Sequence, residues 1–125
     1  MNFFERRKIL KTSNPGDLIP VRAYGHDEVE GKVIILVPKF ESMWIHVLFP
    51  RTERLFYRIK LDELGTVVWK NISGEKNISD ISQLVIKELG EEAKTHNGLE
   101  ERIIKFMSLL YERRYITFRQ FFNSK

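Results

Sequence analysis

The sequence contains no cysteine, which excludes disulfide bonds, thiolate metal sites and a catalytic thiol. It also lacks a long apolar run, because the longest dense one, residues 33–37, stops at Pro38 and is far below the roughly 20 residues that cross a bilayer. Phe3 and Phe4 are followed at once by Glu5 and Arg6, so the apolar stretch of a signal peptide is missing too. These absences predict a cytoplasmic protein without a membrane segment.

The sequence has none of the short motifs that mark common catalytic and metal sites. The histidines, His26, His46 and His96, are isolated from one another, so no pair has the helical i+3 or i+4 spacing of a metal site. Glycine-rich phosphate loops and the G-x-S-x-G elbow are also missing. Neighbouring carboxylates such as Glu91 and Glu92 face different sides of a helix and do not share a substrate. We therefore expect a protein that is not an enzyme and that holds neither a metal nor a cofactor.

The composition is that of a folded domain. Hydrophobic residues make up 42% and charged residues 30% of the 125 residues, which is typical of one globular domain with a core. We divide it into an arm at residues 1–18, a strand region at 19–61, a three-helix unit at 62–116 and a tail at 117–125. The arm mixes aromatic and basic residues and fits either a short helix or an extended segment. The formal net charge of +4 suits an acidic partner.

Two hairpins are predicted in the strand region. Strand-like segments at residues 19–24 and 32–40 flank an acidic stretch at 26–31 that suits a hairpin connection, so we expect the two segments to pair antiparallel. Segments at residues 44–49 and 55–61 flank a second turn, and apolar and polar residues alternate along the latter. The prediction is a small antiparallel sheet of three to four strands.

A change to helical spacing after the sheet predicts three helices. The apolar residues on one face of each are Leu61, Leu64, Val68 and Ile72, then Ile78, Ile81, Val85 and Leu89, then Leu99, Ile103, Phe106 and Leu110. Asp62 and Ser79 are the expected N-caps of the first two helices, and Asn97 with Glu100 has the capping-box spacing at the third. The predicted fold class is α+β, with a small N-terminal sheet followed by a three-helix unit like a winged helix-turn-helix.

The end of the sequence is unusually apolar. Residues 115–118 favour a short strand after the third helix. Phe121 and Phe122 follow it, so we expect the tail to dock on another part of the protein. Because of these two phenylalanines, a purely structural or assembly role of the protein is a further hypothesis.

A sheet followed by three helices is also the plan of many winged-helix DNA readers, so a DNA-binding regulator is the alternative function. The charge distribution argues against this alternative. Between Glu75 and Glu101 there are seven acidic residues and three lysines, which gives a local net charge of 3 − 7 = −4. The second helix, which would read the duplex, offers only Lys87 for phosphate contacts. Nucleic acid is therefore not the expected partner.

The segment LDELGTVVWKNISG at residues 61–74, followed by NISDI at 77–81, resembles the PqqD family in the order and spacing of its motif. That motif is a leucine before Asn/Asp-Glu, a tryptophan near a helix end, a glycine, and the entry to a second helix. The resemblance covers residues 32–116, within which the hairpin at 42–54 looks like an insertion. It implies a biosynthesis accessory protein, a recognition element for ribosomally made and post-translationally modified peptides (RiPPs). Such an element holds the leader of a precursor peptide and presents the core to a modifying enzyme, often a radical S-adenosylmethionine enzyme.

The resemblance also implies where the leader docks, as an added strand in a cleft between the last strand of the sheet and the third helix. The implied peptide-binding residues are Leu55, Phe56, Tyr57, Arg58, Ile59 and Lys60 on the strand and Arg102, Lys105, Phe106, Leu109 and Arg113 on the helix. Phe56, Arg58 and Lys60 share one strand face, and which face turns inward is left open. Trp69 is expected in the core, not in the site. The arm and the inserted hairpin are each available to cover the cleft or to form a homodimer.

Overall fold

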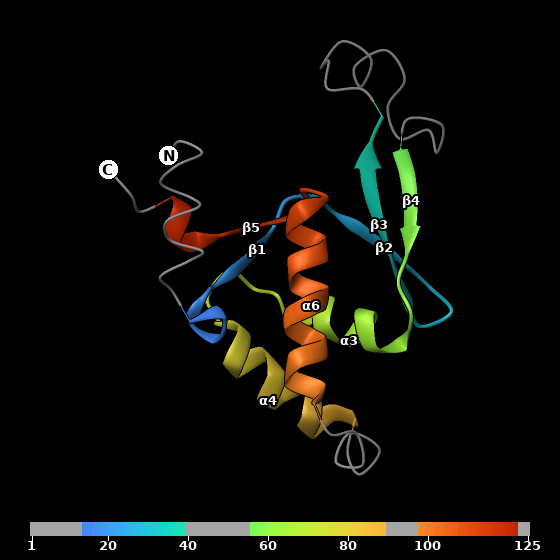
Figure 1. The fold of residues 1–125 in the computed structure, drawn as a ribbon. Helices are drawn as coiled ribbons and strands as arrows, with labels where there is room; N and C mark the ends of the chain where they lie inside the picture. The colour runs from blue at the N-terminus through green and yellow to red at the C-terminus, as the bar shows by residue number, and fades with distance from the viewer. Residues whose placement is uncertain (1–13, 40–55, 90–97, 123–125) are drawn as a thin grey trace. The chain divides into compact units, whose positions relative to one another are not determined.

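The computed structural model describes residues 14–39, 56–89 and 98–122. The chain divides into two compact units, one of residues 24–66 and one of residues 1–23 together with 67–125. In the described ranges, antiparallel strands precede three α-helices (Figure 1), which confirms the predicted α+β class with an N-terminal sheet. No helix of these ranges is both long enough and apolar enough to cross a membrane.

The unit of residues 24–66 contains an antiparallel sheet in the order β2-β3-β4, built from β2 (His26–Val29), β3 (Lys32–Pro38) and β4 (Phe56–Lys60). A two-residue turn joins β2 to β3, with φ of 53° at Glu30 and 77° at Gly31. Two successive positive φ values are those of a type I′ turn, whose twist matches that of a hairpin. The short turn therefore fixes the register in which Val29 lies opposite Lys32.

The predicted pairing of residues 19–24 with 32–40 is wrong. Residues 26–29, which looked like a hairpin connection, are themselves the strand β2 that pairs with β3. Strand β1 (Pro20–Arg22) instead pairs antiparallel with β5 (Ile116–Phe118) in the other unit. The acidic residues of β2 lower its intrinsic strand propensity, but an edge strand with one wet face tolerates them. The second predicted hairpin includes residues 44–49, which lie outside the described ranges.

Helix α3 (Glu63–Lys70) follows β4 directly. The Asp62 side-chain oxygen accepts a hydrogen bond from the Gly65 N–H at 2.7 Å, which confirms Asp62 as the N-cap. The Thr66 hydroxyl accepts a hydrogen bond from the Val33 N–H of β3 at 3.0 Å, so the first turns of α3 are fastened to the sheet. Trp69 is fully buried, as expected for a core residue.

The N-cap of helix α4 (Ile78–Leu89) differs from the prediction. The Asp80 N–H donates to the side-chain oxygen of Asn77 at 2.7 Å, so Asn77 is the N-cap and the prediction of Ser79 is wrong. Ser79 lies in the first turn, where its side chain occupies the space that a Cβ on Gly16 would need. The predicted core positions are confirmed for Ile78 and for the two residues that follow it on the same face, Ile81 and Val85.

We expect the Asn77→Ala variant to lower the free energy of unfolding by about 1 kcal/mol, because it removes the acceptor for one otherwise unpaired N–H of α4. Urea denaturation followed by circular dichroism measures this loss. Ser79→Ala is the matched control, and its effect should be clearly smaller. Equal losses in the two variants would contradict the assignment of the cap.

Helix α6 (Leu99–Glu112) is the longest of the described helices. Leu99, Ile103 and Leu110 are buried as predicted, but Met107 takes the position expected for Phe106, which is only half-buried. The helix begins after Gly98, whose φ of 83° places it in the left-handed region and which has no side chain to cap this end. The proposed capping box includes Asn97, which lies outside the described ranges.

The tail docks, as the sequence predicts, but only in part. Phe121 is buried in the short 3-10 helix η3 (Arg119–Phe121), with its ring 5.7 Å from that of Tyr111 and 5.8 Å from that of Phe118. The Gln120 side chain accepts a hydrogen bond from the Ile19 N–H at 3.0 Å and donates to the Asp17 carbonyl at 2.8 Å. The tail is thereby tied to the 3-10 turn η1 (Pro15–Asp17) and to β1. Phe122, in contrast, is 66% exposed.

Candidate functional site

The strand part of the predicted site is β4, which forms from Phe56 to Lys60 as the alternation indicates. Leu55, the sixth predicted residue, lies outside the described ranges. In the order β2-β3-β4 this strand is at the end of the sheet, hydrogen-bonded to β3 on one side. An edge strand is the part of a sheet to which an extended peptide can add.

The register shows which face of β4 turns inward. Ile59 lies opposite Ile35, which is fully buried, so the face that carries Tyr57 and Ile59 is the inner one. The opposite face carries Arg58, whose guanidinium lies 3.3 Å from the Asp27 carboxylate of β2 in a partly exposed ion pair. Near the start of β4 this inner face is accessible to solvent, because Tyr57 is 56% exposed. The Lys39 ammonium lies 5.2 Å from the centre of the Tyr57 ring.

The main-chain groups of β4 alternate between its two sides. The N–H of Leu61, which follows the strand, donates to the Val33 carbonyl of β3 at 2.9 Å. Because this direction reverses at every residue of an antiparallel strand, Ile59 also points its main-chain groups toward β3, and Lys60 points them toward the outer side. The edge of β4 away from β3 therefore carries the main-chain groups of every second residue, Lys60 among them, which is the spacing that strand addition uses.

The helix part of the predicted site lies on one side of α6. At about 100° per residue, the steps of three and four residues bring its five members into one stripe. Arg102, Lys105, Leu109 and Arg113 are exposed, and Phe106 is half-buried. Leu109 is 44% exposed, so it is not part of the core face of the helix. These residues belong to the unit of residues 67–125 and β4 belongs to the unit of 24–66, so the cleft between them stays a prediction.

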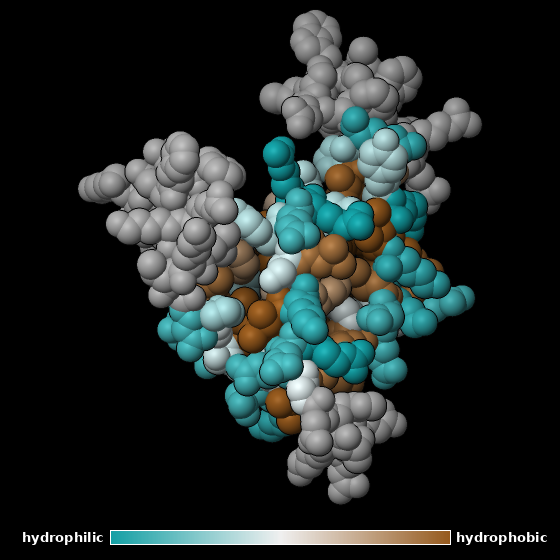
Figure 2. Space-filling view, viewed as in Figure 1, coloured by the Kyte–Doolittle hydropathy of each residue, from teal (hydrophilic) through white to brown (hydrophobic). Residues whose placement is uncertain are grey.

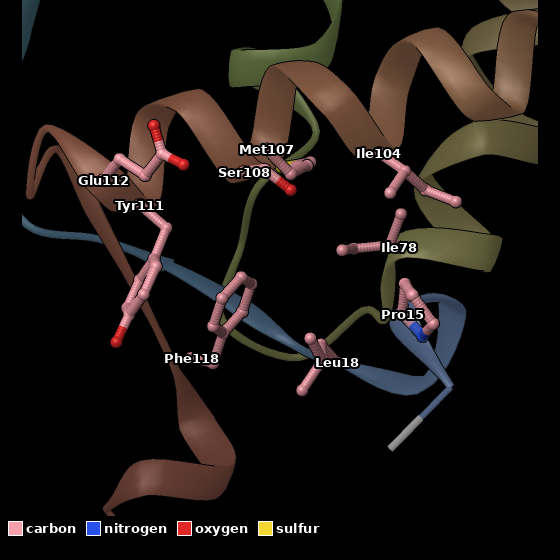
Figure 3. A pocket seen from close by; sticks show the side chains of 9 residues that line it. All are labelled: Pro15, Leu18, Ile78, Ile104, Met107, Ser108, Tyr111, Glu112 and Phe118. Carbon is pink, nitrogen blue, oxygen red and sulfur yellow. The ribbon is translucent and has the colours of Figure 1, made fainter. Parts of the chain in front are cut away.

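The opposite side of α6 borders a pocket that the sequence does not reveal. Its volume is about 400 Å³, and its walls are mostly apolar. The lining residues are Pro15, Leu18, Ile78, Ile104, Met107, Ser108, Tyr111, Glu112 and Phe118 (Figure 3). Brown apolar surface is visible beside α6 on its flank toward η1 in Figure 2. The pocket lies entirely within the unit of residues 1–23 and 67–125.

Each wall of the pocket comes from a different segment of the chain. Figure 3 shows Ile104 and Ser108 on the helix above the space, and below it Leu18, just after η1, and Phe118 in β5. The N–H of Ile78 donates to the Leu18 carbonyl at 2.9 Å, which fixes the start of α4 against the segment after η1. The sequence gives one hint of the pocket. Ile104, Ser108 and Glu112 follow one another at four-residue steps, so they share a flank of the helix that is separate from its core face.

Known proteins give no assignment for this site. In the comparisons, no family model, no curated protein and no solved structure matches the chain. Within residues 14–39, 56–89 and 98–122 there is also no group of three or more histidine or acidic side chains placed to hold a metal ion. The geometry of β4, of the α6 stripe and of the pocket must therefore carry the functional argument.

Proposed function

We propose that the protein binds an extended peptide as an added strand on β4, as its resemblance to the PqqD family implies. The peptide is the leader of a ribosomally made precursor, which the protein presents in the cytoplasm to a modifying enzyme of the radical S-adenosylmethionine class. The single observation that carries the proposal is the position of β4 at the end of the sheet order β2-β3-β4. Addition of a strand gives affinity through main-chain hydrogen bonds, and neighbouring side chains give selectivity.

The charges of the predicted peptide-binding residues favour an acidic peptide. Lys60 is exposed on β4, and Arg102, Lys105 and Arg113 are exposed on α6. The Arg58 guanidinium already pairs with Asp27, so it contributes less new attraction. Exposed charges of this kind steer an acidic partner and add modest affinity that falls with ionic strength.

An N-methyl scan of a bound peptide tests the proposal. Peptides of 15 residues would be selected by display against the full chain, and the tightest would be made with one N-methyl group at each successive residue. Since alternate N–H groups of an added strand point toward its neighbour, affinity should fall about tenfold at every second position and little between them. Isothermal calorimetry gives the dissociation constants. Loss at every position, or at none, would show that the peptide is not added as a strand.

Two variants of one residue locate the pairing on β4. Lys60→Pro removes an outward N–H without removing a bond to β3, and proline is tolerated on edge strands. Lys60→Ala removes the charge and keeps that N–H. We expect the proline variant to bind the selected peptide about tenfold more weakly than the alanine variant. Equal binding by the two variants, or no shifts of the β4 amide resonances on titration, would place the peptide elsewhere.

The charge of α4 supports a peptide partner over DNA. This helix would be the reading helix of a winged-helix protein, yet it exposes Asp80 and Glu88 beside its single lysine, Lys87. Phosphate contacts need several cations on the docking element. A salt-sensitive mobility shift of duplex DNA that disappears in Lys87→Ala would reverse this preference.

A further inference from the structure

The pocket beside α6 has the dimensions of a ligand site. Pockets that bind small ligands or single peptide anchors commonly have about 300–1,000 Å³ and a largely apolar lining with a few polar groups. The volume of about 400 Å³ falls in this range. It suits one aromatic or branched aliphatic side chain with part of its backbone. The group that fills it must be apolar, since Leu18, Ile78 and Met107 offer no polar side-chain partner apart from a weakly accepting thioether.

The rim of the pocket carries one charge. Glu112 is the only carboxylate among the lining residues, which include no lysine, arginine or histidine, and no ion pair joins it to another described residue. Glu112 and Ser108 on the helix are exposed, and so is Pro15 on the opposite wall. Both sides of the opening therefore have residues that contact solvent. A carboxylate at the mouth of an apolar pocket favours a ligand that places a positive charge just outside its apolar group.

We infer that this pocket is a second peptide-binding site, for a segment in which an aromatic or branched apolar residue stands next to a lysine or arginine. The apolar side chain enters between Ile104 and Phe118, and the cation meets Glu112 at the rim. A peptide suits the opening because its backbone can continue along the exposed rim on either side. The inference does not rest on pairing at β4, because the pocket lies on the flank of α6 opposite to the stripe of Arg102 and Leu109.

Short peptides test the inference without knowledge of the natural partner. The probe is the acetylated and amidated tripeptide lysine-phenylalanine-lysine, titrated into full-length protein with labelled isoleucine and methionine methyl groups. We expect methyl shifts at Ile78, Ile104 and Met107. The tripeptide glutamate-phenylalanine-glutamate should bind roughly twofold to fivefold more weakly, which is the range for one exposed charge pair. The tripeptide lysine-alanine-lysine should give no shifts there.

Variants assign the preference to the pocket. Glu112→Gln should bring the affinities for the basic and acidic tripeptides close together, whereas Glu88→Gln, an exposed carboxylate on α4, should leave their ratio unchanged. Ser108→Trp places a bulky ring at the mouth and should reduce binding at least about tenfold. Circular dichroism of this exposed-site variant checks that it folds.

Several results would overturn the inference. Shifts confined to other methyl groups, or equal binding of both charged tripeptides by the unmodified protein, would show that the pocket does not select a cationic apolar segment. Phenethylamine binding as tightly as the basic tripeptide would assign the pocket to a small amine instead of a peptide. Shifts of the same methyls with protein concentration alone would show that a second copy of the chain fills it. If no peptide is found to add as a strand on β4, the results expected for this pocket stay the same.

Discussion

The Trp69→Ala variant is expected to lose about 3–5 kcal/mol of the free energy of unfolding, the largest effect of any single change considered for this protein. Trp69 is fully buried at the end of α3, and among the described residues it is the largest completely buried side chain. Its removal leaves a cavity the size of an indole, which a packed interior closes only in part. A loss of this size would unfold a marginally stable protein at room temperature.

Urea denaturation monitored by far-ultraviolet circular dichroism measures the effect, because the signal does not depend on the missing indole. Trp69→Phe refills most of the cavity and should lose clearly less than the alanine variant. Leu109→Ala, at a position that is 44% exposed, is the control for an apolar residue outside the core and should change stability by less than about 1 kcal/mol. A loss below about 1 kcal/mol in Trp69→Ala would contradict the placement of this residue in the core.

The second large effect is expected at Arg22, which caps the end of α3. Its Nε and Nη2 donate to the Trp69 carbonyl at 3.1 and 2.7 Å, and Nη2 also donates to the Lys70 carbonyl at 3.1 Å. These carbonyls carry the negative end of the helix dipole, so a cation there is favourable. Burial lowers the pKa of Arg22 below its ordinary value, but a guanidinium remains charged in proteins at neutral pH.

We therefore expect Arg22→Ala to lower the free energy of unfolding by about 2 kcal/mol, as expected for the loss of charge-assisted hydrogen bonds in a partly buried place. Arg22→Lys should recover less than half of this, because a single ammonium does not reproduce the fork of donors. Full recovery by lysine would show that charge alone, and not the geometry of the guanidinium, caps the helix.

A double-mutant cycle separates the cap from the ring contact. The Arg22 guanidinium carbon lies 5.5 Å from the centre of the Trp69 ring, within the range of a cation–π interaction. Trp69→Ala keeps the carbonyl that Arg22 binds, so the coupling between the two changes reports the ring contact alone. We expect a coupling of about 0.5–1 kcal/mol. Additive losses would assign the whole effect of Arg22 to the carbonyl groups.

The helices were predictable because their signals are local. Apolar residues at steps of three and four residues placed Ile78, Ile81 and Val85 correctly, and the Asp62 cap needed only the residue before the first turn. The error at α4 has a local cause too, since Asn77 and Ser79 are both good N-caps and the sequence alone does not say which one begins the helix. In the structure the Ser79 side chain lies close to Gly16, a residue from a distant part of the chain.

Strand pairing was less predictable because it depends on distant partners. Nothing in residues 20–22 indicates that they pair with residues 116–118, and the acidic β2 resembled a connection more than a strand. For the candidate site, alternation located β4, but only the register with Ile35 showed that Tyr57 and Ile59 face inward. The pocket could not be predicted from the sequence, because its lining residues come from separate segments that meet only when the chain packs.

The pairing of β1 with β5 has a consequence for the order in which the chain folds. Pro20 lies opposite Phe118, so β1 has to wait for its partner until nearly the whole described chain has left the ribosome. The turn at Glu30 and Gly31, in contrast, lets β2 and β3 meet as soon as both have emerged. Closing a long loop costs entropy before any contact is made that offsets this cost. During synthesis we therefore expect a stage in which this hairpin has formed and β1 has not yet paired with β5. The middle of the sequence would thus acquire structure before its beginning does.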